Sequence, residues 1–406
     1  MSKKDKKLIS KYWITVIVFA VLTVVLNLMA FSKSFCDWYA VTVYRGINAV
    51  VGTLTGWCRI AIGEIIMYVG AALLVLLVIL GIVRLILFKK KAFDLFYKKY
   101  AKSCLAIILA FLFVYTTNWL IPIRGNVLRV SDNTRTIYTN DEVQAVRDIV
   151  VLRLNEIAAQ IGRDESGNVI VDYTQEEIFE IMRARSDEFP KLKGHYSPAK
   201  KALCSAVLDM MGIGGYNYIY TMEPTYNKYM SELYNPVAIS HELCHHKGYY
   251  LENEATFISA VTLAESDDLY CQYCGYLEIY RYINPVCKKN YIMSRLNDPK
   301  LKEDFAPLIE YFSLDPDRDY SNTFMAGLLY EFMFPSLDET VIQDTIYAQE
   351  KSEEAYRQDV NEKVEEIISE PVTKIADKGW EVQGEILKEN IYDGMVLMVL
   401  QYYYNE

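Results

Sequence analysis

Histidine is scarce in this 406-residue chain. There are four His residues in all, and three of them fall between positions 241 and 246. A second centre built from several imidazoles is excluded, because His195 is the one that lies elsewhere. Chemistry that depends on paired histidines is therefore confined to the stretch "HELCHHKGYYLENEA", residues 241–255.

Positive charge is scarce in the larger, C-terminal part of the chain. The first 124 residues hold 16 Lys and Arg against 4 Asp and Glu, which leaves 26 against 48 for residues 125–406. This acidic balance gives no support for nucleic-acid binding, because phosphate backbones are bound through Lys and Arg. The contrast predicts that the two parts of the chain face different environments.

Long apolar runs are confined to the basic part. They cover about residues 13–31, 61–88 and 103–123, and each has the roughly 20 residues that a helix needs to cross a hydrocarbon core. None shows the single apolar stripe of a helix on a soluble core. The sequence therefore predicts a transmembrane region over residues 1–124, with the lipid bilayer as partner, followed by a soluble domain over residues 125–406.

Lysines set the expected orientation. The segments "MSKKDKKLISK" and "FKKKAFDLFYKKYAK" are rich in Lys, whereas residues 32–59 hold one Lys and two Arg. Loops rich in Lys and Arg stay in the cytoplasm. The N-terminus and the second loop are expected there, and three crossings of the cell membrane then place residues 125–406 outside the cytoplasm.

Helical patterns dominate the soluble domain. Apolar spacing predicts a helix over residues 141–161, and Thr174 and Glu177 form a capping box that begins another. A third helix is expected from Ser197, its N-cap, to Gly212. The expected fold class is mainly α, with three N-terminal transmembrane helices before a mostly helical domain.

A small edge-strand element completes this expectation. The stretch "YNYIYTMEPTYN", residues 216–227, has Tyr and Ile at near-alternating positions and predicts one strand, which Pro224 places at an edge or brings to its end. The apolar C-terminal stretch from Gly394 is too short to span a bilayer. It predicts a helix that is buried in the domain or lies on the membrane surface.

The three clustered histidines fit a recognisable pattern. His241 and His245 are four residues apart, so on a helix both imidazoles reach one metal ion. With Glu242 between them they form HExxH, the signature of zinc proteases. In that chemistry the two His hold Zn²⁺, while the Glu accepts a proton from water and passes it to the leaving group.

A catalytic zinc also needs a third protein ligand and an open position. Gly248 can take the left-handed conformation that ends the helix, and Glu252 and Glu254 follow at the start of the next helical pattern. Less than one turn separates these two carboxylates. Both remain candidates for the third ligand, and either choice gives a His₂Glu centre.

The HExxH motif followed by "ENEAT" resembles the gluzincin metallopeptidases, whose pattern is E-x-x-A-(D/N). The resemblance implies that Glu252 is the zinc ligand and Ala255 the small packing residue. Thr256 stands where an Asp or Asn would orient a zinc-binding His, which is a departure from the pattern. The chain is also similar to an uncharacterised family of bacterial multi-pass membrane proteins with an extracytoplasmic zincin-like domain, most specifically over residues 236–257.

Three further residues are candidates for contact with a substrate. A donor for the developing oxyanion is often a Tyr from a later segment, and Tyr273 in "YCGYL" is the first candidate and Tyr392 the second. Both also fit packed aromatic residues. Glu223, at the end of the expected strand, fits either a substrate contact or an exposed turn carboxylate.

Two functions of different classes follow from these observations. The first is a membrane-anchored zinc metallopeptidase that hydrolyses peptide or protein substrates with Glu242 as general base. The alternative is a non-catalytic, metal-dependent binding or sensory module of the cell envelope. Glu242 favours the first, because a structural metal site has no use for a base.

Overall fold

The computed structural model describes residues 10–87, 90–125, 135–387 and 391–404. For residues 379–387 and 391–393 it describes the backbone alone. Three helices are long and apolar enough to cross a membrane, and they cover Lys11–Met29, Ile62–Ile86 and Lys91–Ile123. They correspond to the three expected runs. The third begins at Lys91 and not near 103, because the Lys-rich segment before the apolar run is helical as well.

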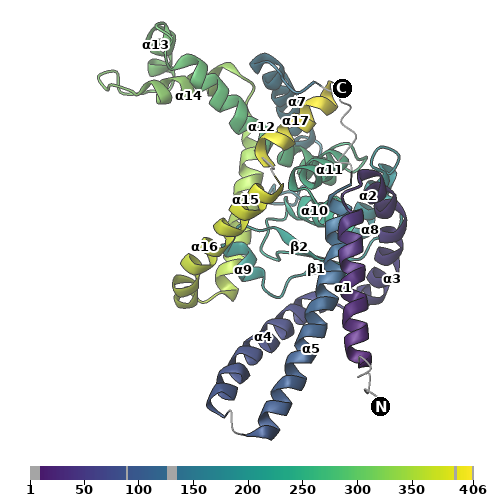
Figure 1. Cartoon of the computed structure of the whole chain (residues 1–406). Helices are drawn as coiled ribbons and strands as arrows, with labels where there is room; N and C mark the ends of the chain where they lie inside the picture. The colour runs from purple at the N-terminus through teal and green to yellow at the C-terminus, as the bar shows by residue number, and fades with distance from the viewer. Residues whose placement is uncertain (1–9, 88–89, 126–134, 388–390, 405–406) are drawn as a thin grey trace, which may run out of the picture.

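The membrane helices project from one side of the molecule (Figure 1). α5 contacts both α1 and α4. Their bounds are α1 (Lys11–Met29), α4 (Ile62–Ile86) and α5 (Lys91–Tyr115), which continues through η2 (Thr116–Leu120) and α6 (Ile121–Ile123).

The connection between the first two membrane helices is itself helical. It consists of α2 (Lys33–Tyr39), η1 (Ala40–Tyr44) and α3 (Arg45–Gly56). One face of this segment is buried against the C-terminal part of the chain, through residues such as Tyr44 and Asn48. The first 124 residues and the remainder of the chain therefore share packed contacts.

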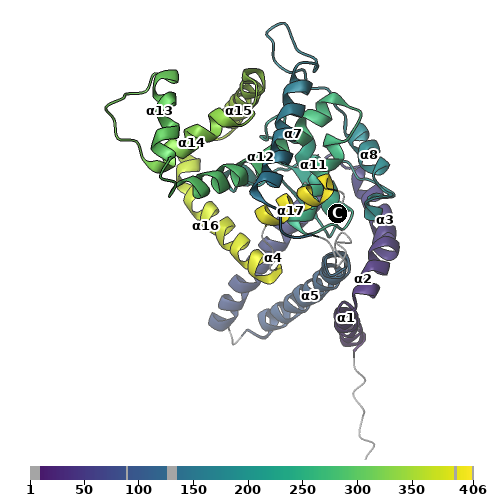
Figure 2. The same cartoon turned by 90° about the horizontal axis from the view of Figure 1, so that it is seen from above.

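Helices make up most of the C-terminal part (Figure 2), which confirms the mostly helical expectation. They are α7 (Asn140–Ala158), α8 (Gln175–Ala184), η3 (Pro190–Leu192), α9 (Ser205–Met210), α10 (Asn235–His246), α11 (Glu252–Ala264), α12 (Leu269–Arg295), α13 (Leu301–Tyr311), α14 (Asn322–Met333), α15 (Glu339–Asp359), α16 (Glu362–Leu387) and α17 (Ile391–Tyr403).

Two sequence expectations fail around the small sheet. The helix expected from Ser197 begins only at Ser205, because Lys200 and Lys201 pair with a strand instead. The single strand expected over 216–227 is a hairpin. The sheet has the order β1-β3-β2, from β1 (Lys200–Lys201), β2 (Gly215–Tyr218) and β3 (Glu223–Tyr226).

Pro224 lies in the central strand of this sheet and not at an edge. The sheet accommodates it because β1 pairs only with Thr225 and Tyr226, so Pro224 lies beyond the end of β1. The turn between β2 and β3 contains Met222, whose φ of 53° is left-handed. The sequence pattern shows only alternation, which does not distinguish one strand from two short ones.

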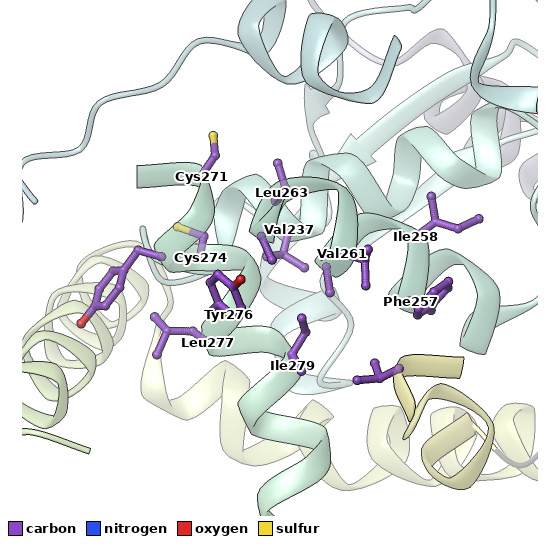
Figure 3. Packing of buried hydrophobic residues seen from close by; sticks show 14 of the residues in the cluster. Val237, Phe257, Ile258, Val261, Leu263, Cys271, Cys274, Tyr276, Leu277 and Ile279 are labelled. Carbon is purple, nitrogen blue, oxygen red and sulfur yellow. The ribbon is translucent and has the colours of Figure 1, made fainter. Parts of the chain in front are cut away.

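The core forms around α11, which is buried along almost its whole length. Figure 3 shows Val261 of α11 close to Val237 of α10 and Ile279 of α12, and Phe257 of α11 on the side of the C-terminal helix α17. α11 and α12 approach closely at Gly275, where an added Cβ would lie 2.4 Å from the backbone nitrogen of Ala264. α17 packs into the same core. The C-terminal helix was expected either inside the domain or on the membrane surface, and the structure shows it inside the domain.

Candidate metal centre

The helix that carries HExxH is α10, and its C-terminal end is fixed by Gly248. Gly248 has a φ of +94°, and its N–H donates to the carbonyl of His245 at 3.0 Å. The N–H of Tyr249 donates to the carbonyl of Cys244 at 3.0 Å. This pair of bonds is the Schellman motif. It confirms the expected helix end and reverses the chain toward the start of α11.

The reversal brings Glu252 to the two histidines. Glu252 Oε2 lies 3.1 Å from His241 Nε2 and 3.5 Å from His245 Nε2. One ligand atom from each of the three residues lies within 4.8 Å of the others. Donors about 2 Å from a common zinc ion in a tetrahedral arrangement are roughly 3.3 Å apart. The three side chains therefore fit one ion, in chemistry and in spacing.

The other nitrogen of each imidazole has its own partner. His245 Nδ1 lies 2.8 Å from the carbonyl oxygen of Tyr249, and because a carbonyl only accepts, Nδ1 carries the proton and Nε2 is left to bind a metal. His241 Nδ1 lies 3.3 Å from the hydroxyl of Thr256. Thr256 thus contacts the imidazole from the position where gluzincins carry Asp or Asn.

The carboxylates and imidazoles of this cluster change one another's pKa values. Burial opposes a charge on His245, but the carboxylates of Glu252 and Glu242 outweigh it and raise its pKa to about 9. Burial likewise opposes the charge on Glu252, and the two imidazoles lower its pKa well below the usual range. Burial lowers the pKa of His241. The second proton, which these carboxylates hold on His245 Nε2, would leave on zinc binding, whereas the Nδ1 proton would stay bonded to the carbonyl of Tyr249.

Glu242 lies beside the three ligands and is 4 % exposed. Burial raises its pKa to about 8, and its Oε2 has no hydrogen-bond partner among the described residues. A buried oxygen without a partner costs free energy. Such an atom is typical of a site whose function uses it.

Strand β2 covers Glu242 from one side. A Cβ added at Gly215 would lie 2.6 Å from Glu242 Cγ and 2.3 Å from the carbonyl oxygen of Thr225. Only glycine permits this approach. Tyr216, the next residue, is 49 % exposed, and β2 is an edge strand of the sheet. No sequence pattern pointed to Gly215, because its role depends on a contact with a residue 27 positions away.

Glu254, the other candidate ligand, is buried near the start of α11. Side chains two residues apart on a helix are separated by about 200° around its axis. Glu252 and Glu254 therefore point in different directions. The structure brings Glu252 to the histidines. Glu254 is not part of the group of ligand atoms found among the described residues.

The candidate oxyanion donor Tyr273 lies elsewhere. Its side chain is fully buried, and its hydroxyl donates to Asp344 Oδ2 at 2.8 Å. Asp344 also pairs with Arg163. Tyr273 is therefore a core residue that links α12 to α15, and the described structure does not bring it to the metal ligands. Tyr392, the second candidate, lies outside the described side chains.

Residues from the connection between the membrane helices hold the end of α10. The Tyr44 hydroxyl donates to the carbonyl of His246 at 3.0 Å and lies 2.9 Å from the hydroxyl of Tyr250. Asn48 Nδ2 donates to the same carbonyl. The Tyr250 ring is nearly parallel to the His245 ring, with centroids 6.0 Å apart. Tyr44 and Asn48 could not be predicted from the motif, because some 200 positions separate them from it.

The chain matches the model of a protein family. Neither a curated protein nor a solved structure matches the chain. A family model described as "Protein of unknown function (DUF3810)" matches residues 39–311. The match begins at the end of α2, in the connection between α1 and α4. It includes His241, His245 and Glu252. It covers about two thirds of the chain, so this protein belongs to the DUF3810 family.

Proposed function

We propose that this protein is a membrane-anchored zinc metallopeptidase. The observation that carries the proposal is the convergence of His241, His245 and Glu252 on one point, beside the partnerless carboxylate oxygen of Glu242. A bound Zn²⁺ would supply the positive charge that polarises a substrate carbonyl and lowers the pKa of a water ligand toward neutrality. The peptide or protein substrate would supply the scissile amide.

The chain's own residues have distinct tasks in this proposal. Glu242 is placed to accept a proton from the attacking water and to deliver it to the leaving nitrogen. Thr256 and the Tyr249 carbonyl orient the two imidazoles. Gly215 lets strand β2 pass close to Glu242, and the exposed Tyr216 beside it is available to a substrate.

Metal analysis tests the centre directly. Purified full-length protein should bind about one zinc per chain, and His241→Ala should lower its affinity for zinc by at least about tenfold, because one of three ligands is lost. His195→Ala is the matched control, since its ring has one polar contact among the described residues, with Ser197 at 3.5 Å. Equal zinc content in the wild type and His241→Ala would contradict the centre.

The proposal includes an orientation, in which the metal centre lies outside the cytoplasm. It rests on the Lys-rich N-terminus and the Lys-rich segment around Lys98. A cysteine introduced at the exposed Glu354 should react with a membrane-impermeant maleimide in intact cells, and one introduced at the exposed Lys98 should not. The unsubstituted chain gives the background from native cysteines. If the Lys98→Cys variant alone is labelled, the orientation is the opposite of the one proposed.

A further inference from the structure

The strand beside Glu242 is fixed at its other end to a membrane helix. Gly215 begins β2 and contacts Glu242, whereas Tyr218 ends it and contacts Gly63 in the first turn of α4, where an added Cβ would lie 2.4 Å from Tyr218 Cβ. Three residue steps along a strand cover about 10 Å. Glu242 is thus roughly one short strand from a helix long and apolar enough to cross a membrane.

The turn after β2 contacts a second membrane helix. Asn118, in the continuation of α5, donates through Nδ2 to the carbonyl of Ile219 at 2.8 Å. The ring of Tyr220 lies against the ring of Phe111 of α5, with centroids 4.4 Å apart. The strand that covers the metal centre therefore contacts α4, and the turn that follows it contacts α5.

α3 approaches the centre from the connection between α1 and α4. Its buried face includes Asn48, which donates to the end of α10. Its outer face carries Val50, Leu54 and Trp57, which are 63 %, 73 % and 88 % exposed. Their spacing of four and three residues places them on one side of a helix.

Lipid is the occupant that fits this outer face. The face is apolar, five residues separate the end of α3 from the start of the membrane helix α4, and Trp is favoured where a bilayer meets water. One helix diameter, about 10 Å, then separates the lipid from the end of α10. The contacts of β2 and its turn with α4 and α5, together with the apolar outer face of α3, place the metal centre at the bilayer surface.

We propose that the substrate is a polypeptide anchored in the same bilayer, cut in the segment that directly follows its anchor. This inference rests on the proposed peptidase function. An extended chain advances about 3.3 Å per residue, so a site 10 to 20 Å from the lipid meets such a chain roughly three to six residues beyond its anchor. Anchoring also raises the effective concentration of that segment at the centre.

Synthetic membrane peptides test the proposal. The zinc-loaded, full-length protein is placed in lipid nanodiscs with a poly-Leu transmembrane peptide whose external end carries a randomised eight-residue segment. A second peptide carries the same segment beyond five EAAAK repeats, a semi-rigid helical spacer of about 38 Å. We expect the near segment to be cut at least about tenfold faster, measured by mass spectrometry of the products.

The outcomes separate the two levels of the proposal. Equal cleavage of the near and far segments would overturn the substrate class and leave the peptidase function standing. No cleavage of either peptide by zinc-loaded protein would overturn both.

A second measurement does not depend on activity. Lipids brominated in their acyl chains should quench the tryptophan fluorescence of the wild type more than that of Trp57→Phe. Equal quenching would show that Trp57 and the outer face of α3 do not contact lipid. That result would overturn the proposal.

Discussion

Glu242→Gln will slow peptide hydrolysis by about 10²–10⁴-fold and leave zinc bound. The amide has the shape of the carboxylate, so it fits beneath Gly215 as the native side chain does. It cannot accept a proton from water, and loss of a general base slows such reactions by about 10²–10⁴-fold. The measurements are the cleavage rate on the near membrane peptide and the zinc content of the same sample.

Glu254→Gln is the matched control for this prediction. Glu254 is a second buried glutamate close to the centre, but it is not one of the three clustered ligands. Its isosteric variant should keep both zinc and activity. If Glu242→Gln cleaves as fast as the wild type, Glu242 is not the base, and the alternative of a metal-dependent binding module gains.

Glu223→Ala will destabilise the protein by about 3–5 kcal/mol. Glu223 is fully buried and is neither an exposed turn carboxylate nor open to a substrate. It pairs with Lys200 and accepts the N–H groups of Ile62 at 3.1 Å and Gly63 at 2.7 Å, at the start of α4. These bonds join the hairpin of the metal centre to the membrane helix.

Removal of this carboxylate leaves a buried ammonium group without its counter-charge. Among the described residues, Lys200 would keep the carbonyls of Thr55 and Ile60 as its partners. Because one partner of a buried pair is costly to remove alone, Glu223→Ala combined with Lys200→Met should recover part of the lost stability. The measurement is the thermal unfolding midpoint of the full chain in detergent.

A surface ion pair provides the control. Glu370 and Lys374 are an i,i+4 pair whose side chains are 75 % and 71 % exposed. Glu370→Ala should leave the unfolding midpoint unchanged within error, since exposed pairs contribute little. A similar loss from Glu223→Ala and Glu370→Ala would contradict the role assigned to the buried pair.

Local spacing in the sequence determined much of the candidate centre. Two histidines four apart converge on any α-helix, and Gly248 ends that helix in the conformation its position predicts. Glu252 follows within a few residues of this turn, so its return to the histidines needs no distant contact. The three apolar runs and the capping box of Thr174 and Glu177 were equally local.

Only the tertiary structure decided which distant groups lie at the centre and which lie elsewhere. Tyr44 lies at the end of α10, Gly215 lies against Glu242, Glu223 holds α4, and Tyr273 bonds Asp344. The helix expected at Ser197 also failed, because Lys200 and Lys201 pair with β3. Spacing along one helix fixes contacts within about a turn. Contacts between elements far apart in the chain depend on how whole faces pack, which a single sequence pattern does not specify.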